Sequence, residues 1–255
     1  MTEQRKRNSI RAARLLLSLL GAAFLTGCGG ADTEEVQDAL SDGVITVGIL
    51  DGEDAYATKT GDVYVGIEPE ILEEAGASSG CTVTYRAAAS SAELMALLDS
   101  GEIEVAAGRL TEQESYTATH LSTRNYGKSG LYLLVPKHLY TDSLAGFSEG
   151  NIGISGSIPE AILSGLPGME ALQQAVYDDA AALAADLEGG VIKAGIVTER
   201  EALSVLRSGA SLRAAELRNS PRLPEVFYLP NTAEYTTLRS ELNTAINSYL
   251  NRQEE

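Results

Sequence analysis

The sequence has 255 residues, of which 44% are hydrophobic, and a formal net charge of −17 at pH 7. This length and apolar content allow a sizeable core in one large domain or two small ones. The acidic balance argues against a protein that binds nucleic acid, because such proteins need a basic surface for the phosphates. Two histidines and two cysteines make a transition-metal site improbable, and no cofactor is expected.

The first 27 residues differ from the rest of the chain. Without them, the sequence retains 35 of its 36 acidic residues but only 14 of its 19 basic residues. A basic start precedes the apolar run Leu15–Leu25 and then small residues, which is the order of an export signal. The run is too short to cross a bilayer as a helix, because that takes about 20 apolar residues.

The end of this segment, Leu25-Thr26-Gly27-Cys28, resembles the bacterial lipobox. In that motif the cysteine thiol is joined to diacylglycerol and the chain is cut just before it. The resemblance implies a signal peptide over 1–27 and a lipoprotein anchored through Cys28 at the extracytoplasmic face of the cell membrane. Two acyl chains would give stable anchoring. The alternative is an N-terminal helix with an incidental cysteine. The Gly-rich and acidic residues 28–43 are predicted to be a tether.

The second cysteine, Cys81, has no disulfide partner if Cys28 is acylated. It begins a strand-like run, so it is interpreted as a small buried hydrophobic residue. A reactive thiol is the alternative, and the absence of a nearby histidine in the sequence disfavours it.

Strand and helix patterns alternate from residue 44 onward. The pair Ser90 and Glu93 has the spacing of a capping box, and Gly101 follows the end of that helix. The order β-α-β-α-β predicts a parallel sheet covered by helices. The predicted strands are 44–50, 81–86 and 104–107, and the predicted helices are 69–77 and 90–99.

The pattern restarts near residue 151, which predicts a second α/β unit. Capping-box pairs at Ser157/Glu160 and Thr198/Glu201 predict two helix starts. Apolar runs at 131–135 and 226–229 are expected to cross between the units. In this part the predicted strands are 151–154 and 194–197, the predicted helix is 179–188, and one face of a final helix carries Leu238, Leu242, Ile246 and Tyr249.

Four local stretches then carry a family resemblance. Three of them are Val63–Leu72, Glu93–Val105 and Ile152–Ser157, and the fourth is His120-Leu121-Ser122 followed by Tyr126–Gly130. In their order and spacing they resemble extracellular solute-binding protein family 3, the amino-acid-binding lipoproteins of ABC importers. The resemblance implies an α/β, two-lobed type II periplasmic-binding-protein fold with two crossing hinge strands. It implies one lobe from 44–132 with 228–255 and another from 137–224.

The resemblance also implies a function. Two lobes of a monomer would close over a small polar solute by a hinge motion, and an ABC permease would recognise the closed form. No enzymatic activity is expected. The alternatives are a ligand-sensing or partner-binding lipoprotein without a transport role, and a dehydratase-like enzyme on the same scaffold.

The resemblance places candidate ligand-binding residues at the ends of strands. Gly108 would present its backbone to the ligand, and Tyr56 would pack on it. Backbone donors at Gly156 and Ser157 would hold an anionic group at a helix start. Thr198 and Glu199 follow the predicted strand 194–197 at the start of a predicted helix and are further candidate ligand-binding residues. Glu199 would pair with an amine of the ligand. Each has a plain structural alternative: a turn glycine, an exposed aromatic, a helix cap or a first-turn acid.

Two departures from the family pattern concern the ligand. Ser115 stands where the family has the arginine that clamps an α-carboxylate, and Leu110 stands where it has a threonine. Arg109 or Arg124 would have to supply the missing positive charge. The alternative for Arg109 is that it is a solvated surface residue. The sequence therefore predicts weak or absent binding of ordinary α-amino acids, and a preference for a cationic or amine-bearing solute held by Glu199.

Overall fold

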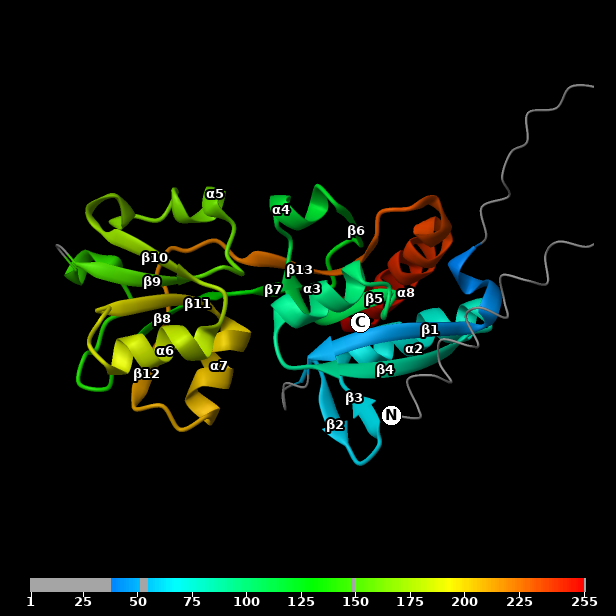
Figure 1. The fold of residues 1–255 in the computed structure, drawn as a ribbon, viewed down its shortest axis with the longest axis horizontal. Coiled ribbons are helices and arrows are strands. Elements are labelled where there is room, and N and C mark those ends of the chain that lie inside the picture. Colours follow the sequence, from blue (N-terminus) through cyan, green and yellow to red (C-terminus); the bar gives the residue numbers. More distant parts are fainter. Residues whose placement is uncertain (1–37, 51–54, 148–149, 255) are drawn as a thin grey trace, which may run out of the picture. The chain divides into compact units, whose positions relative to one another are not determined.

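The computed structural model describes residues 38–50, 55–147 and 150–254 (Figure 1). The predicted signal peptide 1–27 and its lipidation site Cys28 lie outside this part. Within it, no helix has the length and apolar character needed to cross a bilayer.

The first sheet has the strand order β4-β1-β5-β13-β6, and β7 also pairs with β13. Strands β1, β4 and β5 are parallel, as the β-α-β-α-β pattern predicts, whereas β13 runs antiparallel to β5. The strands are β1 (Val44–Leu50), β4 (Thr82–Ala88), β5 (Val105–Thr111), β6 (His120–Ser122), β7 (Gly127–Ser129) and β13 (Leu223–Pro230).

Three helices cover this sheet, and we call the sheet with its helices the first lobe. They are α2 (Ile67–Ser79), α3 (Ser91–Asp99) and α8 (Thr236–Glu254). Successive residues of β5 point to opposite faces: Val105 and Ala107 pack with α2 and α8, and Ala106 packs with α3. All seven β5 residues are buried, because both faces of the sheet are covered.

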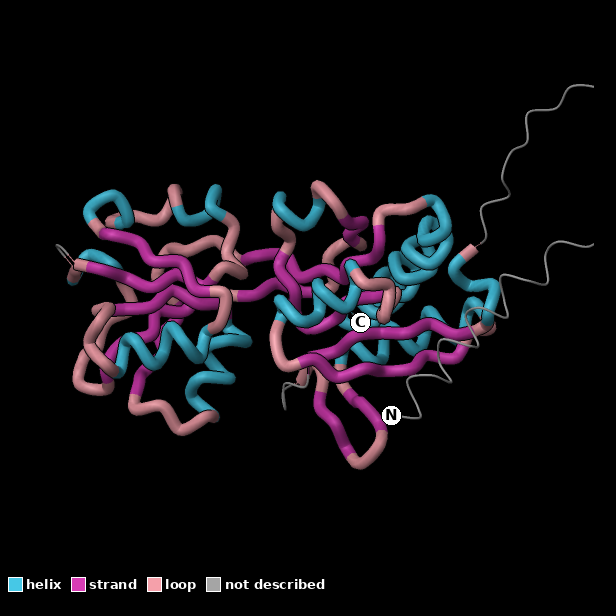
Figure 2. The backbone as a smooth tube through the Cα atoms, viewed as in Figure 1, coloured by secondary structure: helices cyan, strands magenta, loops and turns pink. Residues whose placement is uncertain are grey.

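The second sheet has the order β10-β9-β11-β8-β12 and, with its helices, forms the second lobe (Figure 2). Strands β9, β10 and β11 are parallel, and β8 is antiparallel to β11. The strands are β8 (Leu131–Pro136), β9 (Asn151–Ser155), β10 (Gln173–Tyr177), β11 (Ala194–Thr198) and β12 (Leu212–Glu216), and the helices are α5 (Glu160–Leu163), α6 (Ala180–Glu188) and α7 (Glu199–Arg207).

Smaller elements complete the described chain. A hairpin of β2 (Thr58–Thr60) and β3 (Val63–Val65) precedes α2. The short helix α4 (Glu114–Thr117) follows β5. Single 3₁₀ turns lie at η1 (Ala39–Asp42), η2 (Leu144–Gly146), η3 (Met169–Ala171) and η4 (Ala233–Tyr235).

The long C-terminal helix packs through the face that its periodicity predicts. Leu238, Leu242 and Ile246 are fully buried, Tyr249 is nearly so, and all four join the core beneath β1 and α2. This face fixes the end of the chain to the first lobe.

The chain passes twice between the sheets. One passage is Gly130, between β7 and β8, and the other is 217–222, between β12 and β13. The apolar run 131–135 lies in β8 of the second sheet, and the run 226–229 lies in β13 of the first sheet. Each run therefore lies next to a passage between the sheets rather than in it. They are apolar because both faces of each strand are buried.

Residues 38–43, predicted as part of the tether, are folded. Asp38 caps the 3₁₀ turn η1 by accepting a hydrogen bond from the N–H of Leu40, and Leu40 packs on the core of the first lobe. Cys81 also packs there, although it is only partly buried.

Candidate functional site

The second half of β5 contains a backbone distortion at Gly108 and Arg109. Gly108 has φ 152° and Arg109 has φ 53°, and the pairing of β5 with β13 shifts register opposite them. A positive φ is uncommon for a residue with a side chain and persists where the surroundings fix it. Here the surroundings include a carboxylate from a neighbouring helix.

Glu68, in the first turn of α2, is that carboxylate. Its Oε1 accepts hydrogen bonds from the N–H groups of Gly108 (2.9 Å) and Arg109 (2.8 Å), and from the hydroxyl of Tyr126. Its side chain is completely buried, and burial raises the pKa of Glu68 to about 7, although these hydrogen bonds oppose the increase. Tyr126 is fixed in turn by stacking on Phe227, with ring centroids 4.4 Å apart.

The Arg109 side chain extends into a cage of two carboxylates and one aromatic ring. Its Nε donates to Oε1 of Glu225 at 2.8 Å, and its Nη2 donates to Oε2 of Glu199 at 2.7 Å. The guanidinium carbon lies 3.9 Å from the centroid of the Tyr56 ring, a distance typical of a cation–π contact. Arg109 is 5% exposed.

The electrostatics of this cage depend on burial. Glu225 is fully buried on β13; burial raises its pKa and the Arg109 guanidinium opposes that increase. Burial also lowers the pKa of Arg109, but the carboxylates outweigh this, so the guanidinium stays charged. Burial, followed by the charge of Glu225, raises the pKa of Tyr56 to about 12, which keeps its hydroxyl protonated.

The second lobe contributes Glu199 through the predicted helix start at the end of β11. Thr198 caps α7, and its capping box with Glu201 is confirmed. The N–H of Glu199 donates to the carbonyl of Gly130, which fixes the first turn of α7 beside a passage between the sheets. From there the carboxylate reaches Arg109 on the first lobe, and both lobes belong to the compact unit Val36–Glu255.

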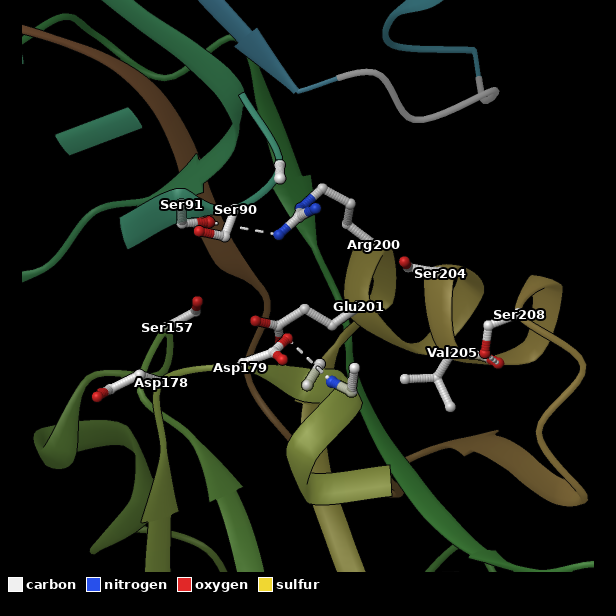
Figure 3. Close-up of a pocket in the computed structure, with 13 residues that line it drawn as sticks. Ser90, Ser91, Ser157, Asp178, Asp179, Arg200, Glu201, Ser204, Val205 and Ser208 are labelled. Carbon is white, nitrogen blue, oxygen red and sulfur yellow. Dashed lines mark hydrogen bonds between the residues drawn. The ribbon is translucent and has the colours of Figure 1, made fainter. Parts of the chain in front are cut away.

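Two further hydrogen bonds join the lobes. The hydroxyl of Thr111 donates to the carbonyl of Ser157 at 2.5 Å. Nη2 of Arg200 donates to Oγ of Ser91 at 3.3 Å, and Figure 3 shows Arg200 extending from α7 towards Ser90 and Ser91 at the start of α3.

The space between these contacts is small. A cavity lined by Arg109, Thr111, Ser157 and Thr198 among others measures about 10 Å³. That is about the volume needed for one water molecule, whereas small-molecule sites are typically about 300–1,000 Å³. The pocket in Figure 3, between Arg200 and Asp179, measures about 100 Å³.

A wider cleft adjoins the small cavity and shares Gln113 with it. It measures about 740 Å³ and lies between the α4 region and the α5 region. Its walls include Ser115 and Gly156, two of the predicted ligand-binding residues. Ser115 is exposed there and offers a neutral hydroxyl.

The three predicted backbone donors have hydrogen-bond partners within the protein. The N–H of Gly108 bonds to Glu68, the N–H of Gly156 to the carbonyl of Tyr177 and the N–H of Ser157 to the hydroxyl of Ser155. All three N–H groups are bonded within the protein in this structure, and their contact with a ligand stays a prediction.

The predicted capping box at Ser157 and Glu160 is wrong. The residue before α5 is Pro159, which makes no side-chain cap, and the helix has four residues. Ser157 lies too early in the chain to cap it. Arg124 is exposed, and Arg109 alone of the two arginines lies at the predicted site.

Sequence reasoning missed Glu68 and Glu225. Glu225 stands in an otherwise apolar strand, and a single acid in such a run is a signal of a buried ion pair. Glu68 had no comparable signal, because an acid in the first turn of a helix is common. The described residues contain no group of three or more His, Cys, Asp or Glu side chains suited to a metal ion.

Comparisons with known proteins identify the fold. No protein-family model matches the sequence, and a comparison with curated proteins finds no match. An amino acid ABC transporter substrate-binding protein from Streptococcus pneumoniae, bound to L-arginine, is similar in structure with a TM-score of 0.64 and 17% identity, over 84% of this chain and 92% of that chain.

Two further solved structures are comparable. The arginine-, lysine-, histidine-binding protein ArtJ from Geobacillus stearothermophilus has a TM-score of 0.60 and 13% identity, over 82% of this chain and 90% of that chain. An ancestral amino-acid-binding protein, a precursor of cyclohexadienyl dehydratase, has a TM-score of 0.61 and 12% identity, over 83% and 92%. The predicted fold class is confirmed: the chain has the two-lobed α/β fold of the type II periplasmic-binding proteins.

Proposed function

We propose that this protein is a solute-binding component of an ABC importer that captures a small cationic solute between its two lobes. The observation that carries the proposal is the meeting of Glu225 and Tyr56 of the first lobe with Glu199 of the second around a guanidinium. This site lies at the carboxyl ends of β5 and β11, where open α/β sheets generally bind ligands. Three structural neighbours are described as arginine-binding proteins, and a fourth was solved bound to L-arginine.

The charge of the site favours a cation over an α-carboxylate. Glu199 and Glu225 both pair with the guanidinium of Arg109, and Glu68 accepts a hydrogen bond from the backbone N–H of the same residue. An arriving carboxylate would meet a guanidinium that is neutralised and would lie near further acids. Because an unpaired buried charge costs several kcal/mol, an anionic group would bind poorly.

A solute held between the lobes also requires them to separate. The cavity of about 10 Å³ at the contact admits no amino acid, whereas the adjoining cleft of about 740 Å³ does. We infer that a solute enters through the cleft beside Gln113 and reaches Glu199 when the lobes open. Hinge opening of this kind is a general property of two-lobed binding proteins.

A thermal-shift screen of residues 36–255 against amino acids, peptides and polyamines tests this function. At 100 times its dissociation constant, a ligand stabilises a protein by about 2.7 kcal/mol, which is readily measured. Arginine, agmatine or a polyamine should raise Tm, and Glu199→Gln should abolish the increase. An increase with glutamate or aspartate alone would contradict the proposal.

A second candidate function is a partner-binding or ligand-sensing lipoprotein without a transport role. The filled contact between the lobes favours it, since the structure holds its closed arrangement with its own side chains. Neighbouring genes for a permease and an ATPase would support the importer. The third alternative, a dehydratase-like enzyme, would require Glu199 to act as an acid or base, but its carboxylate is paired with Arg109.

A further inference from the structure

We propose that Arg109 is a built-in ligand: its guanidinium occupies a guanidinium-binding site formed by both lobes and holds them closed in the absence of solute. This inference stands apart from the importer role, because it describes the resting state of the protein whether or not a solute is transported.

The contacts of Arg109 are those that would recognise a free guanidinium ion. Glu225 and Glu199 each accept a charge-assisted hydrogen bond from a different nitrogen, at 2.8 and 2.7 Å. Tyr56 covers the planar group at 3.9 Å. Planar stacking together with carboxylate pairing is the mode of recognition that distinguishes guanidinium from ammonium. The site is therefore specific in chemistry as well as in charge.

The backbone at Arg109 is held in the conformation that directs its side chain to Glu199 and Glu225. The φ angle of 53° requires support, and Glu68 supplies it by accepting the N–H groups of both Gly108 and Arg109 through one oxygen. The other oxygen of Glu68, Oε2, is buried and has no hydrogen-bond partner among the described residues. Glu68 therefore supports the backbone of Arg109 through one oxygen only.

The arrangement leaves no room for a second occupant. Arg109 itself lines the cavity of about 10 Å³ between the lobes. A solute with a guanidinium group would have to displace this side chain before it could reach Glu199. Competition of this kind lowers the apparent affinity by the fraction of protein in which the site is vacant.

The critical variant is Arg109→Gly, which empties the site and tolerates the positive φ. It leaves the carboxylates of Glu199 and Glu225 without the cation that they share. Methylguanidinium should then bind in the vacated site and restore the two ion pairs. We expect a saturable Tm increase of about 3 °C or more in the variant at ten times its dissociation constant. The wild type should show a smaller increase at the same concentration, because the Arg109 side chain must first leave the site.

Three controls make the result specific. Sodium chloride at equal ionic strength controls for screening, and methylammonium controls for charge without planarity. Arg86→Ala removes an exposed arginine that pairs with Glu102 and should respond to methylguanidinium as the wild type does. Adding Glu199→Gln to Arg109→Gly should weaken the rescue by tenfold or more.

If Arg109→Gly does not fold alone, refolding is followed by circular dichroism during a methylguanidinium titration, and recovery of the folded signal supports the proposal. A separate measurement uses Glu199→Gln in the otherwise unaltered protein. Its radius of gyration in solution scattering should rise, because one inter-lobe ion pair is lost, whereas the exposed control Glu170→Gln should not change it.

The proposal is overturned by equal methylguanidinium responses in wild type, Arg109→Gly and Arg86→Ala, or by failure of methylguanidinium to recover an unfolded Arg109→Gly. An unchanged radius of gyration in Glu199→Gln would show that the ion pair does not hold the lobes. If no natural solute binds in the thermal-shift screen but the methylguanidinium results are as expected, the importer function is rejected and this proposal stands.

Discussion

Nη2 of Arg109 lies 2.7 Å from Oε2 of Glu199, and this ion pair joins two residues 90 positions apart that belong to different sheets. The side chain of Arg109 is 3% exposed and that of Glu199 is 32% exposed. In this pair the arginine is buried and the glutamate is partly exposed to solvent. In the second ion pair of Arg109, with Glu225, both side chains are buried.

The two carboxylates that share Arg109 should differ in their energetic importance. Glu225→Ala should lower the free energy of unfolding by about 3–5 kcal/mol, because it removes the buried partner of a buried charge. Glu199→Ala should lower it by less than about 1 kcal/mol, since solvent screens this partly exposed pair. Urea denaturation of both variants measures the difference, and equal losses would contradict the assignment of Glu225 as the main partner.

Glu68 should make the stability depend on pH. Its pKa rises from 4.5 to about 7 on folding, so the folded protein binds the extra proton between these values. As far as this group is concerned, stability should be greatest at pH 4.5 and below, and should fall by about 3 kcal/mol as the pH rises from 4.5 through 7. Tyr126, Glu225 and Tyr85 are ionisable side chains that interact with it, whereas Arg109 contacts it through the backbone N–H.

Glu68→Gln should remove this dependence, because the amide stays neutral at every pH. Relative to wild type, the variant should gain stability at pH 8 and gain little at pH 5. Chemical denaturation at both pH values measures the change, with the exposed Glu73→Gln on the same helix as a control. A parallel pH dependence in wild type and Glu68→Gln would refute the raised pKa.

Gly108 should not tolerate a side chain. A Cβ at this position would lie 2.6 Å from Cγ of Leu50, and the φ angle of 152° is one that other residues rarely adopt. Gly108→Ala should cost about 1–3 kcal/mol and displace Arg109. Gly146→Ala is the control, because no atom lies within 4 Å of its added Cβ. Equal Tm values for the two variants would contradict this prediction.

Cys28→Ser tests the membrane anchor that the sequence predicts. The acyl chains would have no other attachment point, so the variant should move from the membrane to the soluble fraction. Cell fractionation with immunoblotting measures this, with Cys81→Ser as the matched control. A Cys28→Ser variant that still sediments with membranes after a high-salt wash would exclude lipid anchoring at this residue.

Much of the fold could be predicted because it depends on local patterns. The predicted strand 44–50 coincides with β1, the box at Thr198 and Glu201 forms as expected, and the face of α8 is buried. The hairpin of β2 and β3 and the short strands β6, β7, β10 and β12 were not predicted. Such short strands owe their existence to pairing with distant segments rather than to their own sequence.

The candidate site was predictable only in part. Tyr56, Arg109 and Glu199 do meet, but no sequence pattern indicates that Arg109 pairs with Glu199 and stacks on Tyr56. That arrangement depends on the bulge in β5 and on Glu68, which lies 41 residues from Arg109 in the chain. A bulge of this kind follows from tertiary hydrogen bonds, which residue spacing does not encode.

Titration calorimetry of wild type and Glu199→Gln against the standard amino acids, agmatine and spermidine measures whether Glu199 binds a cationic solute. Heat is expected only from solutes with a guanidinium or amine side chain, with affinity lowered at least tenfold by Glu199→Gln. Sub-micromolar binding of an acidic or neutral amino acid, unchanged in Glu199→Gln, would contradict it.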